Sequence, residues 1–150
     1  SLNRLNEVEF DLASVVRTAM NMLPKLRKIM DWDLQDFSVT CGHRSGEEQE
    51  QLFKEGKSQA RAGQSPHNFK PSRAVGLLPY PWDWGNVTPA DMKRFKELVQ
   101  LIKICAAFKN YRVTSGSDWP RFKDWPHFER VDWRDHGEDR KKLPPRRPRS

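Results

Sequence analysis

Two long stretches of the chain repeat apolar residues with the period of an α-helix. In residues 11–23 and 89–109 the apolar positions recur three or four apart, which places them on one face of each helix. Pro24 interrupts the first pattern and lacks a backbone donor, so we predict that this helix ends there and that a short helical piece covers 25–30. The second helix begins after Thr88, a residue type suited to an N-cap.

Shorter apolar runs predict the strands. They are FSVTC at 37–41, AVGLLP at 74–79, YRVTSG at 111–116 and HFERVDW at 127–133. After the first of them, Ser45 and Glu48 have the spacing of a capping box and Gly56 suits a C-terminal cap, which predicts a helix of about ten residues. Arg44 then lies at the corner between strand and helix. Helices interleaved with several short strands favour an α+β domain with a small sheet.

Charge and composition set the C-terminal end apart from the rest of the chain. The net charge is +7; residues 134–150 carry seven Lys or Arg against three Asp or Glu, a net of +4, which leaves +3 for residues 1–133. The end segment is polar and rich in proline, so we predict a folded domain at 1–133 and a flexible basic tail at 134–150. Such a tail either binds anionic envelope polymers or serves only for solubility. Because the domain itself is only mildly basic, we expect no specific nucleic-acid binding.

The compartment of the chain follows from two further observations. The sequence has no run of eighteen apolar residues and no secretory signal at its start, so we expect a monomer made in the cytoplasm. Cys41 and Cys105 fall inside an apolar strand and an apolar helix, so we expect both to be reduced, with a disulfide as the alternative. Neither belongs to a CxxC pair, which argues against a thiolate zinc site.

The candidate chemistry lies in two segments that are far apart in the sequence. An irregular loop over 57–73 carries His67, and the last strand starts at His127, three residues after Asp124. A catalytic zinc needs three protein ligands, an open position for water and a nearby group that accepts the proton of that water. Taken alone, two histidines this far apart are weak evidence, because surface, core and hydrogen-bonding roles are more common for histidine.

Four stretches of the sequence together change that interpretation. They are GHRS at 42–45, SPH at 65–67, SRAVGLLPYPWDW at 72–84 and DWPHFE at 124–129. In this order they resemble the zinc-dependent D-alanyl peptidases, a group that contains D-alanyl-D-alanine carboxypeptidases and phage endolysins that cut the L-alanyl-D-glutamate bond of peptidoglycan stem peptides. The resemblance covers residues 10–132. It implies an α+β fold of the hedgehog type, with a small, mainly antiparallel sheet packed with helices.

The resemblance also implies roles for particular residues. It makes His67 and His127 ligands of Zn²⁺, and Asp124 the general base that takes a proton from a zinc-activated water. Arg44 contacts the substrate and stabilises the developing oxyanion. Ser65 either hydrogen-bonds substrate or a ligand histidine, or merely caps its loop.

Gly76 departs from the family pattern at a metal-ligand position. The family has an aspartate in an Ala-x-Asp pattern, but here Ala74 and Val75 are followed by Gly76, which offers no ligand. We therefore predict weak metal binding and impaired activity. Asp83 is the nearest carboxylate downstream, but an extended chain would place it on the order of 20 Å away. Three explanations stay open: a recent loss by selection or deliberate inactivation, a natural relative that is poor in metal, or an unrecognised third ligand.

The function predicted from these residues is that of a phage-type endolysin, a peptidoglycan L-alanyl-D-glutamate endopeptidase impaired by Gly76. Such an enzyme would act on the cell wall in the periplasm after the membrane has been permeabilised. A D-alanyl-D-alanine carboxypeptidase is one alternative. The other is a non-catalytic peptidoglycan-binding module that holds the stem peptide through Arg44 and tryptophans. Four tryptophans either line such a groove or pack in the core: Trp82, Trp84, Trp119 and Trp125.

Overall fold

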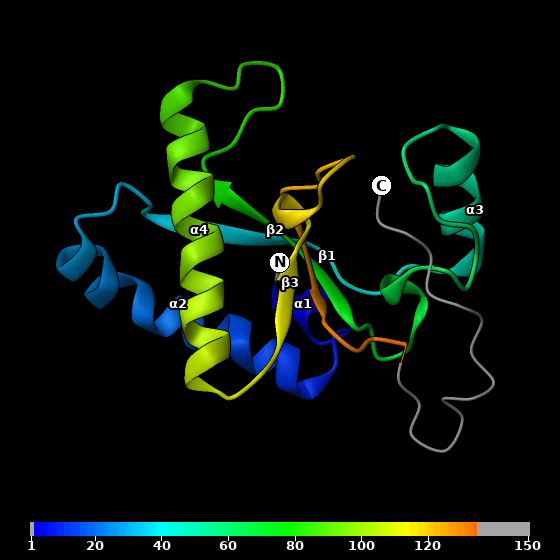
Figure 1. The fold of residues 1–150 in the computed structure, drawn as a ribbon, viewed down its shortest axis with the longest axis horizontal. Coiled ribbons are helices and arrows are strands. Elements are labelled where there is room, and N and C mark those ends of the chain that lie inside the picture. The colour runs from blue at the N-terminus through cyan, green and yellow to red at the C-terminus, as the bar shows by residue number, and fades with distance from the viewer. Residues whose placement is uncertain (1, 135–150) are drawn as a thin grey trace.

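A four-stranded antiparallel sheet in the order β1-β2-β4-β3 organises the chain (Figure 1). This computed structural model describes residues 2–134. Its elements are α1 Leu2–Leu5, α2 Phe10–Met30, β1 Asp36–Cys41, α3 Gly46–Lys54, the short 3-10 helix η1 Pro66–Asn68, β2 Ala74–Tyr80, α4 Pro89–Phe108, β3 Val113–Ser115, the 3-10 helix η2 Gly116–Asp118 and β4 His127–Arg130. The predicted α+β fold with a small antiparallel sheet is thereby confirmed. Apart from Arg134, the predicted basic tail lies outside the described residues.

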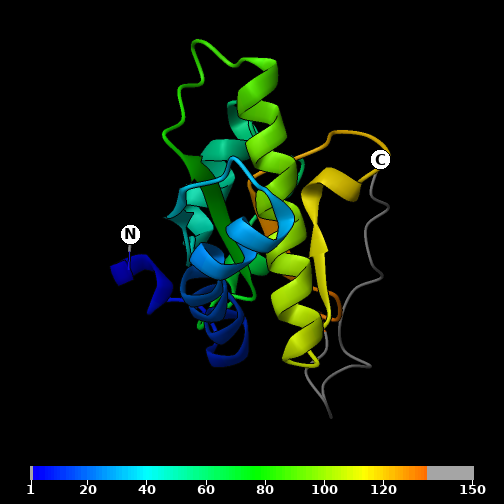
Figure 2. The ribbon, with the colours of Figure 1, turned by 90° about the vertical axis from the view of Figure 1, so that its left-hand side faces the viewer.

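Helices α2 and α4 pack against each other and against the sheet, and the main core lies between these layers (Figures 1 and 2). Leu12 and Val16 of α2, Leu98 and Ile102 of α4, and Phe128 of β4 are fully buried in it. Helix α3 lies on the far side of the sheet from α2, beside η1. The sheet therefore has one face that is covered by the long helices and one end that is left to the loops of α3, η1 and η2.

The prediction that the first helix ends at Pro24 is wrong. Helix α2 continues to Met30 with Pro24 inside it. A proline removes one intrahelical hydrogen bond, but the apolar face continues across it. Leu23 is buried and Leu26 packs against the core, so tertiary packing holds the helix together. The helix ends instead at Asp31, which adopts a left-handed conformation with φ of 55°.

Other local signals predicted their elements well. Thr88 caps α4, since its hydroxyl accepts a hydrogen bond from the backbone of Asp91 at 3.1 Å. Ser45 and Glu48 form the predicted capping box of α3. The strands predicted at 111–116 and 127–133 are shorter than expected: β3 covers Val113–Ser115 and β4 covers His127–Arg130.

Cys105 is buried, Cys41 is half-buried, and both are free thiols, as predicted. Within the described part of the chain, no helix combines the length and the hydropathy needed to span a membrane.

Glu97 is a buried carboxylate that ties α4 to the turn after α2. It accepts hydrogen bonds from the backbone N–H groups of Asp33 at 3.0 Å and Leu34 at 2.9 Å, and it pairs with Lys93 at 3.3 Å. We expect Glu97→Gln to lower the free energy of unfolding by about 1–3 kcal/mol, because the amide replaces a charged acceptor at two buried donors. Thermal denaturation measures this loss. The exposed Lys96→Gln on the same helix is the control and should leave stability unchanged.

Candidate active site

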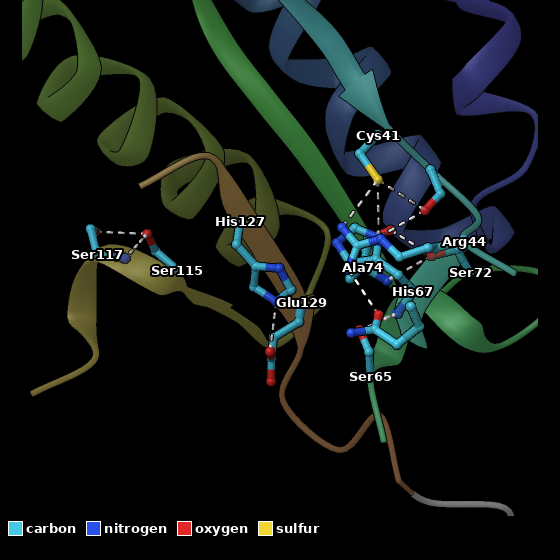
Figure 3. Close-up of polar contacts among 12 residues, drawn as sticks. Cys41, Arg44, Ser65, His67, Ser72, Ala74, Ser115, Ser117, His127 and Glu129 are labelled. Carbon is cyan, nitrogen blue, oxygen red and sulfur yellow. Dashed lines mark hydrogen bonds and ion pairs between the residues drawn. The ribbon is translucent and has the colours of Figure 1, made fainter. Parts of the chain in front are cut away.

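The fold brings together two histidines that are sixty residues apart in the sequence. His67 lies in η1 and His127 is the first residue of β4. Their ring centroids are 5.1 Å apart in an edge-to-face arrangement, with 74° between the ring planes. Both residues are buried, and Figure 3 shows their side chains. This pair is the centre of the candidate site.

His67 is held by its loop as a neutral imidazole with one free nitrogen. Its Nδ1 lies 2.7 Å from the carbonyl oxygen of Gly42, which can only accept, so Nδ1 carries the proton and Nε2 is left with a lone pair. Burial, the neighbouring His127 ring and the Arg44 guanidinium hold the pKa of His67 well below its ordinary value. The ring is therefore neutral at pH 7, which is the form that binds a metal.

Ser65 sets the position of the His67 backbone. Its hydroxyl accepts a hydrogen bond from the N–H of His67 at 3.2 Å, and its side chain caps η1. This geometry favours the capping interpretation of Ser65. Because Ser65 also lines the cleft described below, its contact with substrate stays a prediction.

His127 is oriented by a carboxylate that the sequence reasoning missed. Its Nε2 lies 2.7 Å from Oε1 of Glu129, and both side chains are buried. A carboxylate accepts, so Nε2 donates, and in the neutral ring Nδ1 keeps the lone pair. The ring of Trp119 packs on His127 with centroids 5.1 Å apart. The strand period offered a signal, because residues two apart on β4 project from the same face.

Arg44 is fixed at the predicted corner by contacts from two sides. Its Nη1 donates to Oε1 of Gln49 at 2.9 Å. Its backbone N–H donates to the carbonyl of His67 at 2.8 Å, and its own carbonyl accepts from Asn68 at 3.0 Å. Gln49 is completely buried, and its amide also donates to the carbonyl of Ala60 at 2.7 Å. This buried glutamine, which the sequence reasoning also missed, connects Arg44 to the loop that carries His67.

All five predicted site residues line one cleft of about 520 Å³; they are Arg44, Ser65, His67, Asp124 and His127. Asp124 is exposed at this cleft and is held through its backbone, since its N–H donates to the carbonyl of Gly116 at 3.0 Å and its carbonyl accepts from the N–H of His127 at 3.1 Å. A Cβ at Gly116 would lie 2.0 Å from that carbonyl oxygen. Only glycine permits this close approach, so the Asp124 backbone is fixed relative to the histidine pair.

The tryptophans divide between the two predicted roles. Trp119 lines the cleft, whereas Trp82 and Trp125 pack against the core and Trp84 is 64% exposed. Trp133 also lines the cleft, and the sequence reasoning did not include it.

Gly76 lies in the middle of β2, next to the histidine pair. It is paired with His127 on β4 and with Cys41 on β1. A Cβ at this position would be 3.0 Å from the Cβ of Cys41 and 3.0 Å from Oγ1 of Thr40, which is a tight contact. Asp83 does not replace the missing carboxylate: it lies beyond β2, outside the lining of the cleft, and its Oδ1 accepts a hydrogen bond from the backbone of Gly85 at 2.8 Å.

The residues present do not fit a three-ligand catalytic zinc. Among residues 2–134, no group of three or more His, Cys, Asp or Glu side chains is arranged to hold a metal ion. His67 and His127 supply two nitrogens, and Gly76 supplies no donor where the third ligand is expected. A zinc site of the family type is therefore incomplete in the described part of this chain.

Comparison with known proteins identifies the family. The family model of the phage L-alanyl-D-glutamate peptidase matches residues 1–137. The chain belongs to this family. The resemblance drawn from the four sequence stretches is thereby confirmed.

The chain is also similar to two individual proteins. The peptidoglycan L-alanyl-D-glutamate endopeptidase CwlK of Bacillus subtilis strain 168 is 29% identical over 107 residues, which cover 64% of this chain and 61% of that protein. This family member thus spans about three fifths of the length of that curated relative. The crystal structure of the L-Ala D-Glu endopeptidase ChiX of Serratia marcescens is similar with a TM-score of 0.65 and 27% identity, over 87% of this chain and 86% of that one.

The Glu129 contact yields a prediction for a variant of this family member in which Asp has been placed at position 76. In that background, we expect Glu129→Gln to weaken zinc binding about 10-fold to 100-fold, because the amide no longer orients and polarises the His127 ring. Competition with a chromogenic chelator measures the affinity. Asp118→Asn, which removes an exposed carboxylate paired with Lys103, is the matched control and should leave the affinity unchanged.

Proposed function

We propose that this chain is a peptidoglycan L-alanyl-D-glutamate endopeptidase of the endolysin type, and that Gly76 impairs its hydrolysis. One observation carries the proposal: in a member of this family, Arg44, Asp124 and the histidine pair line a single cleft. The two relatives, both named as endopeptidases for this bond, support the same choice. The substrate is then the stem peptide of peptidoglycan.

The roles of the residues follow from their positions in the cleft. Asp124 is an exposed carboxylate beside His127, suited to take a proton from an attacking water and return it to the leaving amine. Arg44 presents a guanidinium held by Gln49, suited to bind a substrate carboxylate or the oxyanion that develops on the scissile carbonyl. His67 and His127 keep one lone pair each for a metal ion, for which Zn²⁺ is the candidate.

We expect impaired hydrolysis because the cleft offers too few ligands for a metal ion. Zinc, when bound, would polarise the scissile carbonyl and lower the pKa of a bound water. Removal of a group that merely orients a ligand typically weakens metal binding about 10-fold to 100-fold, so the absence of a ligand at Gly76 should weaken it more. Gly76 also removes the negative charge that would balance the metal. We therefore assign no metal-dependent step to the unaltered chain.

The proposal extends to the setting of the enzyme. A monomer made in the host cytoplasm would reach the wall from the periplasm after the membrane has been permeabilised. The basic segment at 134–150, which lies outside the described residues apart from Arg134, would favour contact with anionic envelope polymers. No role in specific nucleic-acid binding is proposed.

A non-catalytic peptidoglycan-binding module is the second candidate, and Gly76 is the observation that favours it. Such a module would hold the stem peptide in the same cleft without cutting it. It differs from an endopeptidase disabled at one position, because it would stay inactive when a carboxylate is placed at 76.

The test compares the unaltered chain with Gly76→Asp and Gly76→Ala, each supplied with zinc, on purified Gram-negative peptidoglycan. Mass spectrometry of the released fragments identifies the bond that is cut. We expect new N-terminal D-glutamate only with Gly76→Asp; the alanine variant controls for the added Cβ. A new free D-alanine would indicate the carboxypeptidase alternative instead. If no variant releases fragments, the endopeptidase proposal fails and the binding module takes its place.

A further inference from the structure

The cleft carries an excess of positive charge over the rest of the domain. Its lining contains one carboxylate, Asp124, and five cationic side chains: Arg44, Lys57, Arg121, Lys123 and Arg134. Residues 1–134 as a whole carry a net charge of only +4. Low-dielectric walls lined by one sign of charge concentrate ligands of the opposite sign. The cleft is therefore suited to a ligand with more than one carboxylate.

Four of these cations have partners in the structure. Arg44 is bound by a buried glutamine, and Lys57 pairs with a neighbouring glutamate at 3.2 Å. Lys123 donates to two loop carbonyls at 3.0 and 2.9 Å, and Arg134 stacks on a tryptophan ring. Arg121 differs, since it is exposed and makes no side-chain hydrogen bond or ion pair with any residue in 2–134. Among residues 2–134, its guanidinium is therefore open to a ligand, in addition to the Arg44 guanidinium.

Arg121 lies on a loop that is held in place at both ends. The backbone contact between Gly116 and Asp124 closes the base of this loop, and Lys123 crosses it to bind the carbonyls. Phe122, the residue after Arg121, has a φ of 53° and is 62% exposed. A bulky residue rarely adopts this left-handed conformation, and such backbone strain is concentrated at functional sites. The loop therefore presents Arg121 from a fixed position near Asp124.

We propose that Arg121 recognises the free carboxylate of the D-glutamate residue on the leaving side of the scissile bond. This inference rests on the proposed function. A glutamate that continues a peptide through one carboxyl group keeps the other carboxyl group free. This free carboxylate belongs to the residue whose amine is released when the bond is cut. A guanidinium matches a carboxylate with two parallel hydrogen bonds, whereas a carboxamide turns an N–H group toward it. Arg121 thus makes the cleft selective for the acid over its amide.

The experiment measures binding without turnover. The unaltered chain and Arg121→Gln are titrated with the tripeptide L-Ala-γ-D-Glu-L-Lys and with its α-carboxamide, using the fluorescence of the cleft tryptophans Trp119 and Trp133. We expect the acid to bind the unaltered chain about twofold to fivefold more tightly than the amide, since solvent screens an exposed ion pair. Arg121→Gln should remove this preference and leave the affinity for the amide unchanged. Arg112→Gln, an exposed arginine outside the cleft lining, is the control and should keep the preference.

The outcomes separate this inference from the proposed function. Equal affinity of the unaltered chain for acid and amide, or an equal loss of both in Arg121→Gln, would overturn the role of Arg121. Cleavage of peptidoglycan by Gly76→Asp alongside such a result leaves the endopeptidase proposal standing. Failure of either tripeptide to bind, together with no cleavage by Gly76→Asp, would overturn both.

Discussion

The Gly76→Asp variant will bind one equivalent of zinc and hydrolyse peptidoglycan, whereas the unaltered chain will do neither at a comparable level. We expect zinc affinity to rise by about 100-fold or more, because a third ligand and a balancing charge are gained. We expect the hydrolysis rate to rise on the order of 10³-fold or more, since a metal ion contributes several kcal/mol to the stabilisation of the transition state.

The position of Gly76 in the sheet is the reason for this expectation. Residues directly opposite each other on antiparallel strands project to the same face, with Cβ atoms about 5 Å apart. Gly76 stands opposite His127, and the ring of His127 is next to that of His67. A carboxylate at 76 therefore enters the space beside both imidazoles.

The same substitution also has a steric cost in stability, which can be measured separately from the effect of zinc binding. The added Cβ meets Cys41 and Thr40 at 3.0 Å, so their side chains must shift by a few tenths of an ångström. We expect Gly76→Ala and Gly76→Asp to lose on the order of 1–2 kcal/mol of stability without zinc. Zinc should then raise the melting temperature of Gly76→Asp alone. If zinc affects both variants equally, the assignment of the histidine pair as ligands is wrong.

In the Gly76→Asp background, Asp124→Asn will reduce hydrolysis by about 10²-fold to 10⁴-fold and leave zinc affinity unchanged. The reason is that an amide cannot accept the proton of the attacking water. Asp124 lies at the cleft three residues before His127, and its backbone is fixed by Gly116, so the substitution changes the chemistry of the side chain and leaves its position unchanged.

Two measurements check this second prediction. Turnover of a soluble stem peptide reports hydrolysis, and chelator competition reports zinc affinity. Asp118→Asn is the control, because it removes a carboxylate from the preceding 3-10 helix that pairs with Lys103 outside the cleft. A parallel fall of zinc affinity in Asp124→Asn would instead make Asp124 a metal ligand.

Much of the fold was accessible from the sequence because the signals were local. The capping boxes of α3 and α4 lie within four consecutive residues, and the apolar period of α4 repeats over its whole length. Pro24 was the exception. Its local effect predicted the end of a helix, but burial of Leu23 and packing of Leu26 on the core extend α2 to Met30. Packing against distant residues outweighed one lost hydrogen bond.

The residues of the candidate site could be predicted from the sequence, but the groups that orient them could not. The sequence stretches identified Arg44, Ser65, His67, Asp124 and His127, and all five line one cleft. The absence of a side chain at Gly76 was equally visible, since it is a property of one residue. No local pattern predicted which groups would orient these residues.

The sequence by itself therefore determined the helices with strong caps, the residue types of the site and the gap at position 76. Only the tertiary structure decided that Glu129 orients His127, that buried Gln49 holds Arg44, and that Arg121 has no side-chain partner among residues 2–134. These contacts depend on which ring nitrogen faces which oxygen, and on which charged groups already have partners. The folded sheet and its loops decide this, because they bring together groups from distant parts of the chain.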